Sequence, residues 1–125
     1  MKEETKKKIL ILEDEKPLAH ALELKLTHEG FDVVTTDNGE TGVSLLQSEK
    51  FDLVLSDLII PGLDGFGVLE TIRTKKINVP VIVMTNLNQE EDRKRANDLG
   101  AVDFFVKSNS TLSEIVETVK KKVKN

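Results

Sequence analysis

Short apolar runs recur along this chain, and each is followed by a segment with the apolar spacing of a helix. The runs are Ile9–Leu12, Val33–Val34, Leu53–Leu55, Val81–Met84 and Val102–Val106. Most of them carry no polar alternation, which is typical of parallel strands that helices cover on both faces. Strands that alternate with helices predict a parallel sheet with right-handed crossovers. The sequence therefore predicts an α/β fold in which a strand and a helix alternate five times.

The segments between the runs contain signals for where helices begin and end. Pro17 suits the first turn of a helix and Gly30 the position just after its end, which predicts a first helix between them. The second helix is predicted over about 39–49 and the third from about 65. The positions expected to face inward are Leu18, Ala21, Leu22, Leu26, Val43, Leu45, Leu46, Phe66, Val68, Leu69 and Ile72.

The last two helices are expected to begin at capping boxes. Asn88 with Glu91, and Thr111 with Glu114, have the spacing of an N-cap residue and its partner in the first turn. These pairs predict a fourth helix after Asn88 and a fifth after Thr111.

Length and composition limit what the chain can be. Its 125 residues predict one domain over 1–125, with a charged tail over 1–7, a core over about 8–123 and no fused second domain. The absence of Cys excludes disulfides, thiolate zinc sites and thiol catalysis, and it fits a cytoplasmic location. The longest apolar stretch, Val79–Met84, is too short to cross a membrane. The net charge of −4 argues against non-specific nucleic-acid binding.

Acidic residues follow two of the predicted strands at the point where each strand ends. Glu13, Asp14 and Glu15 come after the first run, and Asp57 comes after the third. Ligands of open α/β sheets bind beyond the carboxyl ends of the strands, so these carboxylates are expected to share one pocket. Oxygen ligands without His or Cys favour a hard cation, and few protein ligands plus water favour Mg²⁺ over Ca²⁺. The alternative is that residues 13–15 only cap the first helix.

Two more strand ends carry polar side chains, Thr85 after the fourth run and Lys107 after the fifth. Taken singly, each is an ordinary surface or turn residue. Together with Asp57 they predict phosphoryl transfer to an aspartate, because the carboxylate is the nucleophile and a metal, a lysine and a hydroxyl can cover the three equatorial oxygens. This set of groups is complete without a general base.

The order and spacing of these residues resemble the CheY-like receiver domain of two-component response regulators over essentially the whole length. The matching residues are Glu13, Asp14, Asp57, Pro61, Asp64, Gly65, Thr85, Gly100, Ala101, Phe104 and Lys107. The resemblance implies a flavodoxin-like, doubly wound (βα)5 fold with the five parallel strands in the order 2-1-3-4-5. It also implies a stand-alone response regulator in phosphorelay signal transduction, a phosphoprotein that phosphorylates and dephosphorylates itself and is not a turnover enzyme.

The resemblance assigns the metal site residue by residue. Asp57 would be the phosphoacceptor, and the side chains of Asp14 and Asp57 would bind Mg²⁺. Ile59 would contribute its backbone carbonyl, and Glu13 would act through water.

The resemblance also assigns a signalling role to three residues near the last two strands. Thr85 and Lys107 would each bind a phosphoryl oxygen. Phe104 would be an aromatic switch that turns inward when the threonine moves toward the phosphoryl group. Its alternative role is packing in the core, and the two roles are compatible.

Partners are likewise implied by the resemblance. A sensor histidine kinase or a phosphotransfer protein would dock near Pro17, Leu18 and Ala21. A downstream target protein would read the face formed by helix 4, strand 5 and helix 5. The protein would be a monomer or a phosphorylation-dependent dimer, with no nucleic-acid or membrane partner.

Three residues depart from the usual pattern of the family. Ser108 stands where the family usually has a proline joined by a cis bond, and a cis bond before a non-proline residue costs about 2.5–4 kcal/mol. The bond is therefore trans or is held under strain, which leaves the placement of Lys107 open. Asn86 replaces the more usual Ala or Gly after the threonine, and Ile59 is apolar. We expect Asn86 and Ile59 to slow hydrolysis of the acyl phosphate.

Several other functions fit the sequence less well. Haloacid dehalogenase-type phosphatases need a second Asp where this chain has Ile59, and the acidic run 13–15 would repel a flavin phosphate. The segment Gly62–Gly67 lacks the Gly-Lys-Ser/Thr of a nucleotide loop. Nucleic-acid binding through residues 93–95 has no stacking aromatics to support it. The alternative that remains is a receiver-fold adaptor protein that works without phosphorylation.

Overall fold

The structure is a computed structural model that describes residues 6–123. Its elements are β1 (Lys8–Leu12), α1 (Lys16–His28), β2 (Asp32–Thr36), α2 (Gly39–Ser48), β3 (Leu53–Ser56), α3 (Gly65–Thr74), β4 (Val81–Thr85), α4 (Glu90–Asp98), β5 (Asp103–Val106), a single 3₁₀ turn η1 (Lys107–Asn109) and α5 (Leu112–Val123). The predicted alternation of strands and helices is confirmed. The predicted tail over 1–7 lies outside the described residues except at positions 6 and 7. Among the residues described, no helix is long and apolar enough to span a membrane.

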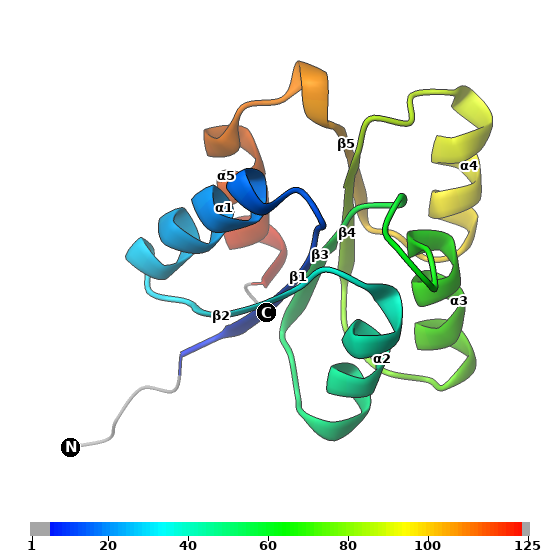
Figure 1. Cartoon of the computed structure of the whole chain (residues 1–125), viewed down its shortest axis with the longest axis horizontal. Coiled ribbons are helices and arrows are strands. Elements are labelled where there is room, and N and C mark those ends of the chain that lie inside the picture. Colours follow the sequence, from blue (N-terminus) through cyan, green and yellow to red (C-terminus); the bar gives the residue numbers. More distant parts are fainter. Residues whose placement is uncertain (1–5, 124–125) are drawn as a thin grey trace.

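The strands form one parallel sheet in the order β2-β1-β3-β4-β5, which confirms the order that the family resemblance implied. Figure 1 shows α1 and α5 together on one face of this sheet, and α2, α3 and α4 on the other. Because all strands run the same way, their carboxyl ends meet at one edge of the sheet. The residues that follow the strands are therefore brought together by the topology.

The core is divided by the sheet into two apolar layers, because alternate side chains of a strand point to opposite faces. In β1, Ile9 and Ile11 pack in the layer covered by α1 and α5, whereas Leu10 and Leu12 pack in the layer covered by α2, α3 and α4. All four side chains are fully buried. A strand buried on both faces explains the uninterrupted apolar run in the sequence.

The two predicted capping boxes have different outcomes. At α5, Thr111 N donates to Glu114 Oε1 at 2.8 Å and Glu114 N donates to Thr111 Oγ1 at 3.1 Å, which confirms the prediction. At α4 the prediction of Asn88 as the cap is wrong. The N-cap residue is Gln89, which makes no side-chain capping bond, and the helix begins at Glu90. The sequence spacing was correct for a capping box, but the chain enters this helix one residue later.

The buried face of α1 is rotated slightly from the predicted one. Leu22 and Leu26 are fully buried as expected, but the third buried residue is Ala19, while Ala21 is only half-buried. Gly30 follows the helix with φ +100°, a conformation in which glycine is unstrained and other residues are not. This turn leads directly into β2.

Candidate functional site

The acidic residues predicted to meet do so at the carboxyl edge of β1 and β3. These strands are neighbours in a register that pairs Leu12 with Ser56, so Glu13 and Asp57 are the next residues on each. Glu13 and Asp57 are buried, whereas Asp14 is exposed. Oxygen atoms from these three carboxylates all lie within 4.8 Å of one another. Like charges at this separation need a cation to neutralise them.

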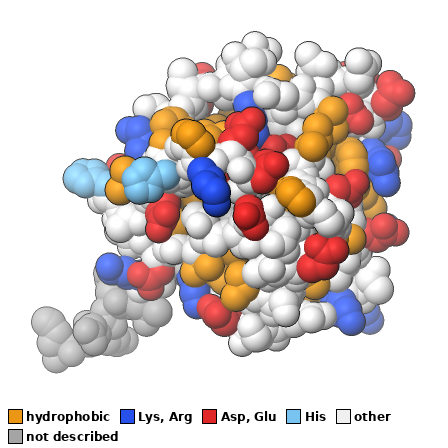
Figure 2. Space-filling view, in the orientation of Figure 1, with side chains coloured by type: hydrophobic (Ala, Val, Ile, Leu, Met, Phe, Trp, Pro, Cys, Tyr) orange, Lys and Arg blue, Asp and Glu red, His pale blue; other side chains and the backbone are white. Residues whose placement is uncertain are grey.

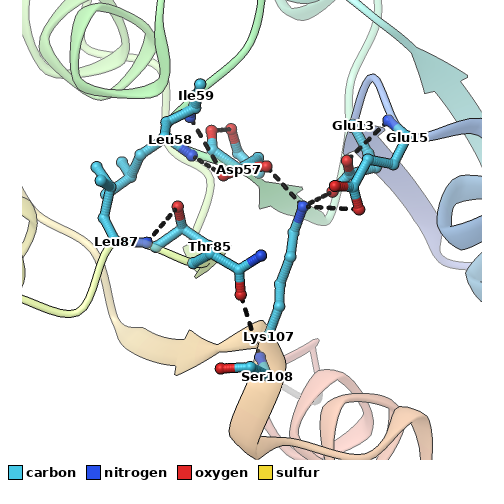
Figure 3. A network of polar contacts seen from close by, with 11 residues as sticks. Glu13, Glu15, Asp57, Leu58, Ile59, Thr85, Leu87, Lys107 and Ser108 are labelled. Atoms are coloured by element: carbon cyan, nitrogen blue, oxygen red, sulfur yellow. Dashed lines mark hydrogen bonds and ion pairs between the residues drawn. The ribbon is translucent and has the colours of Figure 1, made fainter.

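Lys107, which follows β5 at the same edge of the sheet, supplies such a cation. Its Nζ lies 2.7 Å from Asp57 Oδ2, 2.8 Å from Glu13 Oε1 and 3.4 Å from Glu15 Oε1. Figure 3 shows the lysine side chain extending from η1 to reach between Asp57 and Glu13. Burial alone lowers the pKa of Lys107, but the bonds to Asp57 and Glu13 outweigh it, so the pKa is raised and the ammonium stays charged.

The environment of Glu13 fits a bound cation. Burial raises the pKa of this carboxyl above its ordinary value, while Lys107 and the backbone N–H of Glu15 oppose the shift by stabilising the charged form. Glu13 Oε1 is buried, and among the described residues its one polar contact is the ion pair with Lys107. The three carboxylates of Glu13, Asp14 and Asp57 are compatible with Mg²⁺, because this ion prefers oxygen ligands.

The carboxylate of Asp57 is oriented by the backbone that follows it. Leu58 N and Ile59 N donate to Asp57 Oδ1 at 2.7 Å and 3.2 Å, and Lys107 occupies Oδ2. The sequence analysis did not predict the two amide bonds, because backbone donors leave no signal in residue type. The side chain of Ile59 is 57% exposed beside this site. Its expected role through the backbone carbonyl stays a prediction.

Close packing of α3 fixes the loop that carries Asp57. Gly65 N donates to Leu58 O at 3.0 Å, and Asp64 caps the helix by accepting from Gly67 N at 2.9 Å. A Cβ at position 65 would lie 2.5 Å from Leu58 Cα and would also meet the Asp57 backbone. Gly65 is therefore required by the close approach of the helix to the loop and not by an unusual φ.

Thr85 ends β4 at the same edge of the sheet. It is fully buried, and its hydroxyl accepts a hydrogen bond from Leu87 N at 3.3 Å. Within residues 6–123 no hydrogen bond joins Thr85 to Asp57. The threonine thus lies near the acidic site without contacting the predicted phosphoacceptor.

The bond after Lys107, which the sequence left open, is trans, since the described chain contains no cis peptide. Ser108 N instead donates to the side-chain Oδ1 of Asn86 at 3.2 Å. Sequence analysis singled out Asn86 and Ser108 separately but did not predict that they are bonded. Only the pairing of β4 with β5, which places Thr85 opposite Val106, brings them together.

Phe104 lies away from the acidic site, on the α4 side of β5. Its half-buried ring packs against the core layer under α2, α3 and α4, and the guanidinium of Arg93 lies 4.7 Å from the ring centroid. Both residues line a groove of about 390 Å³ between α4 and β5, whose other walls include Glu90, Lys94 and Asn97. The ring is therefore held by apolar packing on its inner side and by a cation–π contact on the groove side.

Comparison with known proteins gives a consistent result. Residues 9–120 match the response regulator receiver domain family. The cell cycle response regulator CtrA of Brucella ovis is 36% identical over 100 residues, which cover 80% of this chain and 43% of CtrA. The matched curated relatives are therefore more than twice as long as the shared segment.

Solved structures agree with the fold. The Francisella response regulator 1452 receiver domain has a TM-score of 0.89 and 26% identity, covering 94% of this chain and 97% of that one. The non-phosphorylated HemR receiver domain of Leptospira biflexa has a TM-score of 0.88 and 28% identity, covering 96% of each chain. The CheY-like receiver from Methanospirillum hungatei, at 24% identity and a TM-score of 0.89 over 95% of this chain and 94% of that one, shares the fold.

Proposed function

The chain belongs to the response regulator receiver domain family of phosphorelay signalling, and from this premise we propose that it accepts a phosphoryl group on Asp57. The observation that carries the proposal is the contact of Lys107 Nζ with Asp57 Oδ2 at 2.7 Å beside a buried Glu13. A lysine in this position neutralises charge on the carboxylate before a phosphoryl group arrives. The same cation can then bind an oxygen of that group.

In the proposed step, a carboxylate oxygen of Asp57 attacks the phosphorus of a phosphohistidine in a partner protein. The new P–O bond forms as the P–N bond breaks, and the imidazole nitrogen keeps the electron pair. No proton is removed from the nucleophile, so no general base is needed. Hydrogen bonds from Leu58 N and Ile59 N to Oδ1 orient the carboxylate for this attack.

We assign the metal site to Glu13, Asp14 and Asp57, with the carbonyl of Ile59 as a further ligand. When bound, Mg²⁺ supplies positive charge between two anionic reactants. The side chains of Asp14 and Asp57 would hold the ion, and Glu13 would act through water. Lys107 contacts both Glu13 and Asp57, so its ammonium and a bound cation would share the negative charge of these two carboxylates.

Thr85 is proposed to bind a second phosphoryl oxygen with its hydroxyl. Its hydroxyl can donate to that oxygen while it accepts from Leu87 N, so a shift of Thr85 toward Asp57 would move the loop before α4 through this bond. Movement of this loop would loosen the Arg93 contact on Phe104 and let the ring turn inward. The result would be a changed surface over α4, β5 and α5, which we propose as the face read by a downstream target.

We propose further that the protein acts as a stand-alone, cytoplasmic switch that is phosphorylated and dephosphorylated without turnover of a substrate. A sensor histidine kinase or phosphotransfer protein would be the donor, and the protein would be a monomer or a phosphorylation-dependent dimer. Figure 2 shows acidic and basic side chains interspersed on the face in view, with no continuous basic surface there. That distribution supports a protein partner over nucleic acid.

The experiment is intact mass spectrometry after incubation with a small-molecule acyl phosphate and Mg²⁺. We expect one phosphoryl adduct on the wild type and none on Asp57→Asn. Asp98→Asn, at the exposed end of α4, is the matched control and should form the adduct normally. A wild-type protein without an adduct, under conditions where a known receiver is modified, would favour the phosphorylation-independent adaptor.

A further inference from the structure

The residues immediately before and after Lys107 are both joined to the end of β4 or to the loop that follows it. On one side, Val106 is paired with Thr85 in the β4–β5 ladder. On the other side, Ser108 N donates to Asn86 Oδ1 at 3.2 Å. The backbone of Lys107 therefore lies between two attachments to consecutive residues of one neighbouring strand and its loop.

The Asn86 contact satisfies a hydrogen-bond donor that the turn cannot satisfy itself. The first N–H groups of any helical turn have no internal acceptor. Within η1, the turn closes through Ser110 N to Lys107 O at 3.4 Å and Ser110 Oγ to Val106 O at 2.9 Å. Ser108 N instead donates to a side chain in the loop that follows β4. A proline at position 108 would have no N–H to donate.

We infer that Asn86 is a positioning residue for Lys107, acting through the backbone N–H of Ser108. This inference rests on the proposed function, in which Lys107 and Thr85 each bind a phosphoryl oxygen. Because Asn86 is covalently next to Thr85, one side-chain hydrogen bond joins the two segments that carry these groups. Thr85 and Lys107 would then approach the phosphoryl group together.

Exposure of the contact indicates that its role is geometric. Asn86 and Ser108 are both exposed, so water competes for the bond and its net contribution to stability is small. The ammonium of Lys107, in contrast, is mostly buried and has to reach Asp57 Oδ2 at the end of a flexible side chain. Fixing the start of that side chain favours the placement of its charged end.

The test compares Asn86→Ala with Asn88→Ala, a matched control in the same exposed loop whose side chain makes no hydrogen bond to the described part of the chain. Hydrogen exchange at the Ser108 amide is measured by NMR in the unphosphorylated protein. The initial rate of phosphorylation by a small-molecule acyl phosphate with Mg²⁺ is measured in parallel. We expect Asn86→Ala to speed the exchange and slow the phosphorylation, each by about two- to tenfold. Asn88→Ala should change neither.

A second background separates positioning from any direct effect of Asn86 on the phosphoryl group. In Lys107→Ala, the further change Asn86→Ala should leave the phosphorylation rate unaltered, because the lysine that it positions is gone. An equal slowing in both backgrounds, or unchanged exchange at Ser108, would overturn the inference. Faster exchange in Asn86→Ala together with a wild type that is never phosphorylated would support the contact and count against the proposed function alone.

Discussion

Lys107 Nζ and Asp57 Oδ2 lie 2.7 Å apart, although the residues are 50 positions apart in the chain. The strand order produces this contact, since β3 and β5 both flank β4 and end at the same edge of the sheet. Glu13 follows β1, which pairs with the other side of β3, and its carboxylate also contacts Lys107. The acidic site therefore contains its own counter-ion.

Removal of that counter-ion should destabilise the metal-free protein. Lys107→Ala leaves the buried carboxylates of Glu13 and Asp57 without their cation, and we expect the free energy of unfolding to fall by about 3 kcal/mol. Added Mg²⁺ should stabilise Lys107→Ala more than it stabilises the wild type, because in the variant no ammonium already neutralises Glu13 and Asp57. Urea unfolding with and without Mg²⁺ measures both effects. Lys121→Ala, an exposed lysine on α5, is the control; an equal loss in the two variants would contradict the prediction.

The raised pKa of Glu13 predicts a pH-dependent difference between wild type and Glu13→Gln. In the metal-free fold Glu13 binds its proton more tightly than in the unfolded chain, whose value is near 4.5. The contribution of Glu13 to the free energy of unfolding is therefore fully present below pH 4.5 and is lost as the pH rises through the raised pKa. Glu13→Gln has no carboxyl to titrate here, so the free energy of unfolding of this variant relative to wild type should be greater at pH 7.5 than at pH 4.5. Urea unfolding in a chelator tests this, and a difference that shrinks with pH would exclude it.

Two glycines in the first turn of α3 should respond differently to alanine. At Gly65 the new methyl group meets the backbone of Asp57 and Leu58, which cannot move freely, so we expect a loss of about 2 kcal/mol and slower phosphorylation. At Gly67 the nearest atom is Leu63 Cδ1, at 2.5 Å, which can rotate away, and the gain in helix propensity offsets part of the clash. Thermal unfolding of both variants tests the contrast. Equal losses would show that Gly65 has no special relation to the site.

Ile59 and Asn86 are predicted to slow loss of the phosphoryl group. The exposed side chain of Ile59 lies next to the Asp57 loop and offers no hydrogen bond to an attacking water. We expect Ile59→Asn, and to a smaller extent Asn86→Ala, to shorten the half-life of the phosphorylated protein by about two- to tenfold. Loss of the adduct is followed by intact mass after the donor is removed. Half-lives equal to that of wild type in both variants would remove this explanation.

The sequence predicted the parts of the fold that depend on local pattern. The buried run Ile9–Leu12 was recognised as a strand, and the pair Thr111 and Glu114 as a helix start, because each carries its signal within a few residues. The prediction of Asn88 as an N-cap was wrong because it relied on local spacing alone. The spacing of Asn88 and Glu91 fitted a capping box, but α4 begins one residue later, at Glu90. The loop before it is shaped by the hydrogen bond from Leu87 N to Thr85, which local spacing does not reveal.

The candidate site divides in a similar way. Acidic strand ends and the general rule for open α/β sheets were enough to expect Glu13 and Asp57 together. The contacts that fix the geometry were not predictable, because they use backbone N–H groups of Leu58, Ile59 and Ser108, which every non-proline residue possesses. Which of those donors find an acceptor depends on strand register, and the register is a property of the folded sheet.

The position of each strand within the sheet gives the site two mechanically different halves. Glu13 and Asp57 follow β1 and β3, strands with a partner on either side and fully buried apolar residues. Lys107 follows β5, an edge strand whose residues are all only half-buried. Separating β5 from the sheet breaks the hydrogen bonds to one neighbouring strand, whereas separating β1 breaks those to two. The part of the site with Glu13 and Asp57 is therefore expected to be more rigid than the part with Lys107. We therefore expect a change at Asp57 to displace Lys107 and β5 more readily than Glu13 and β1.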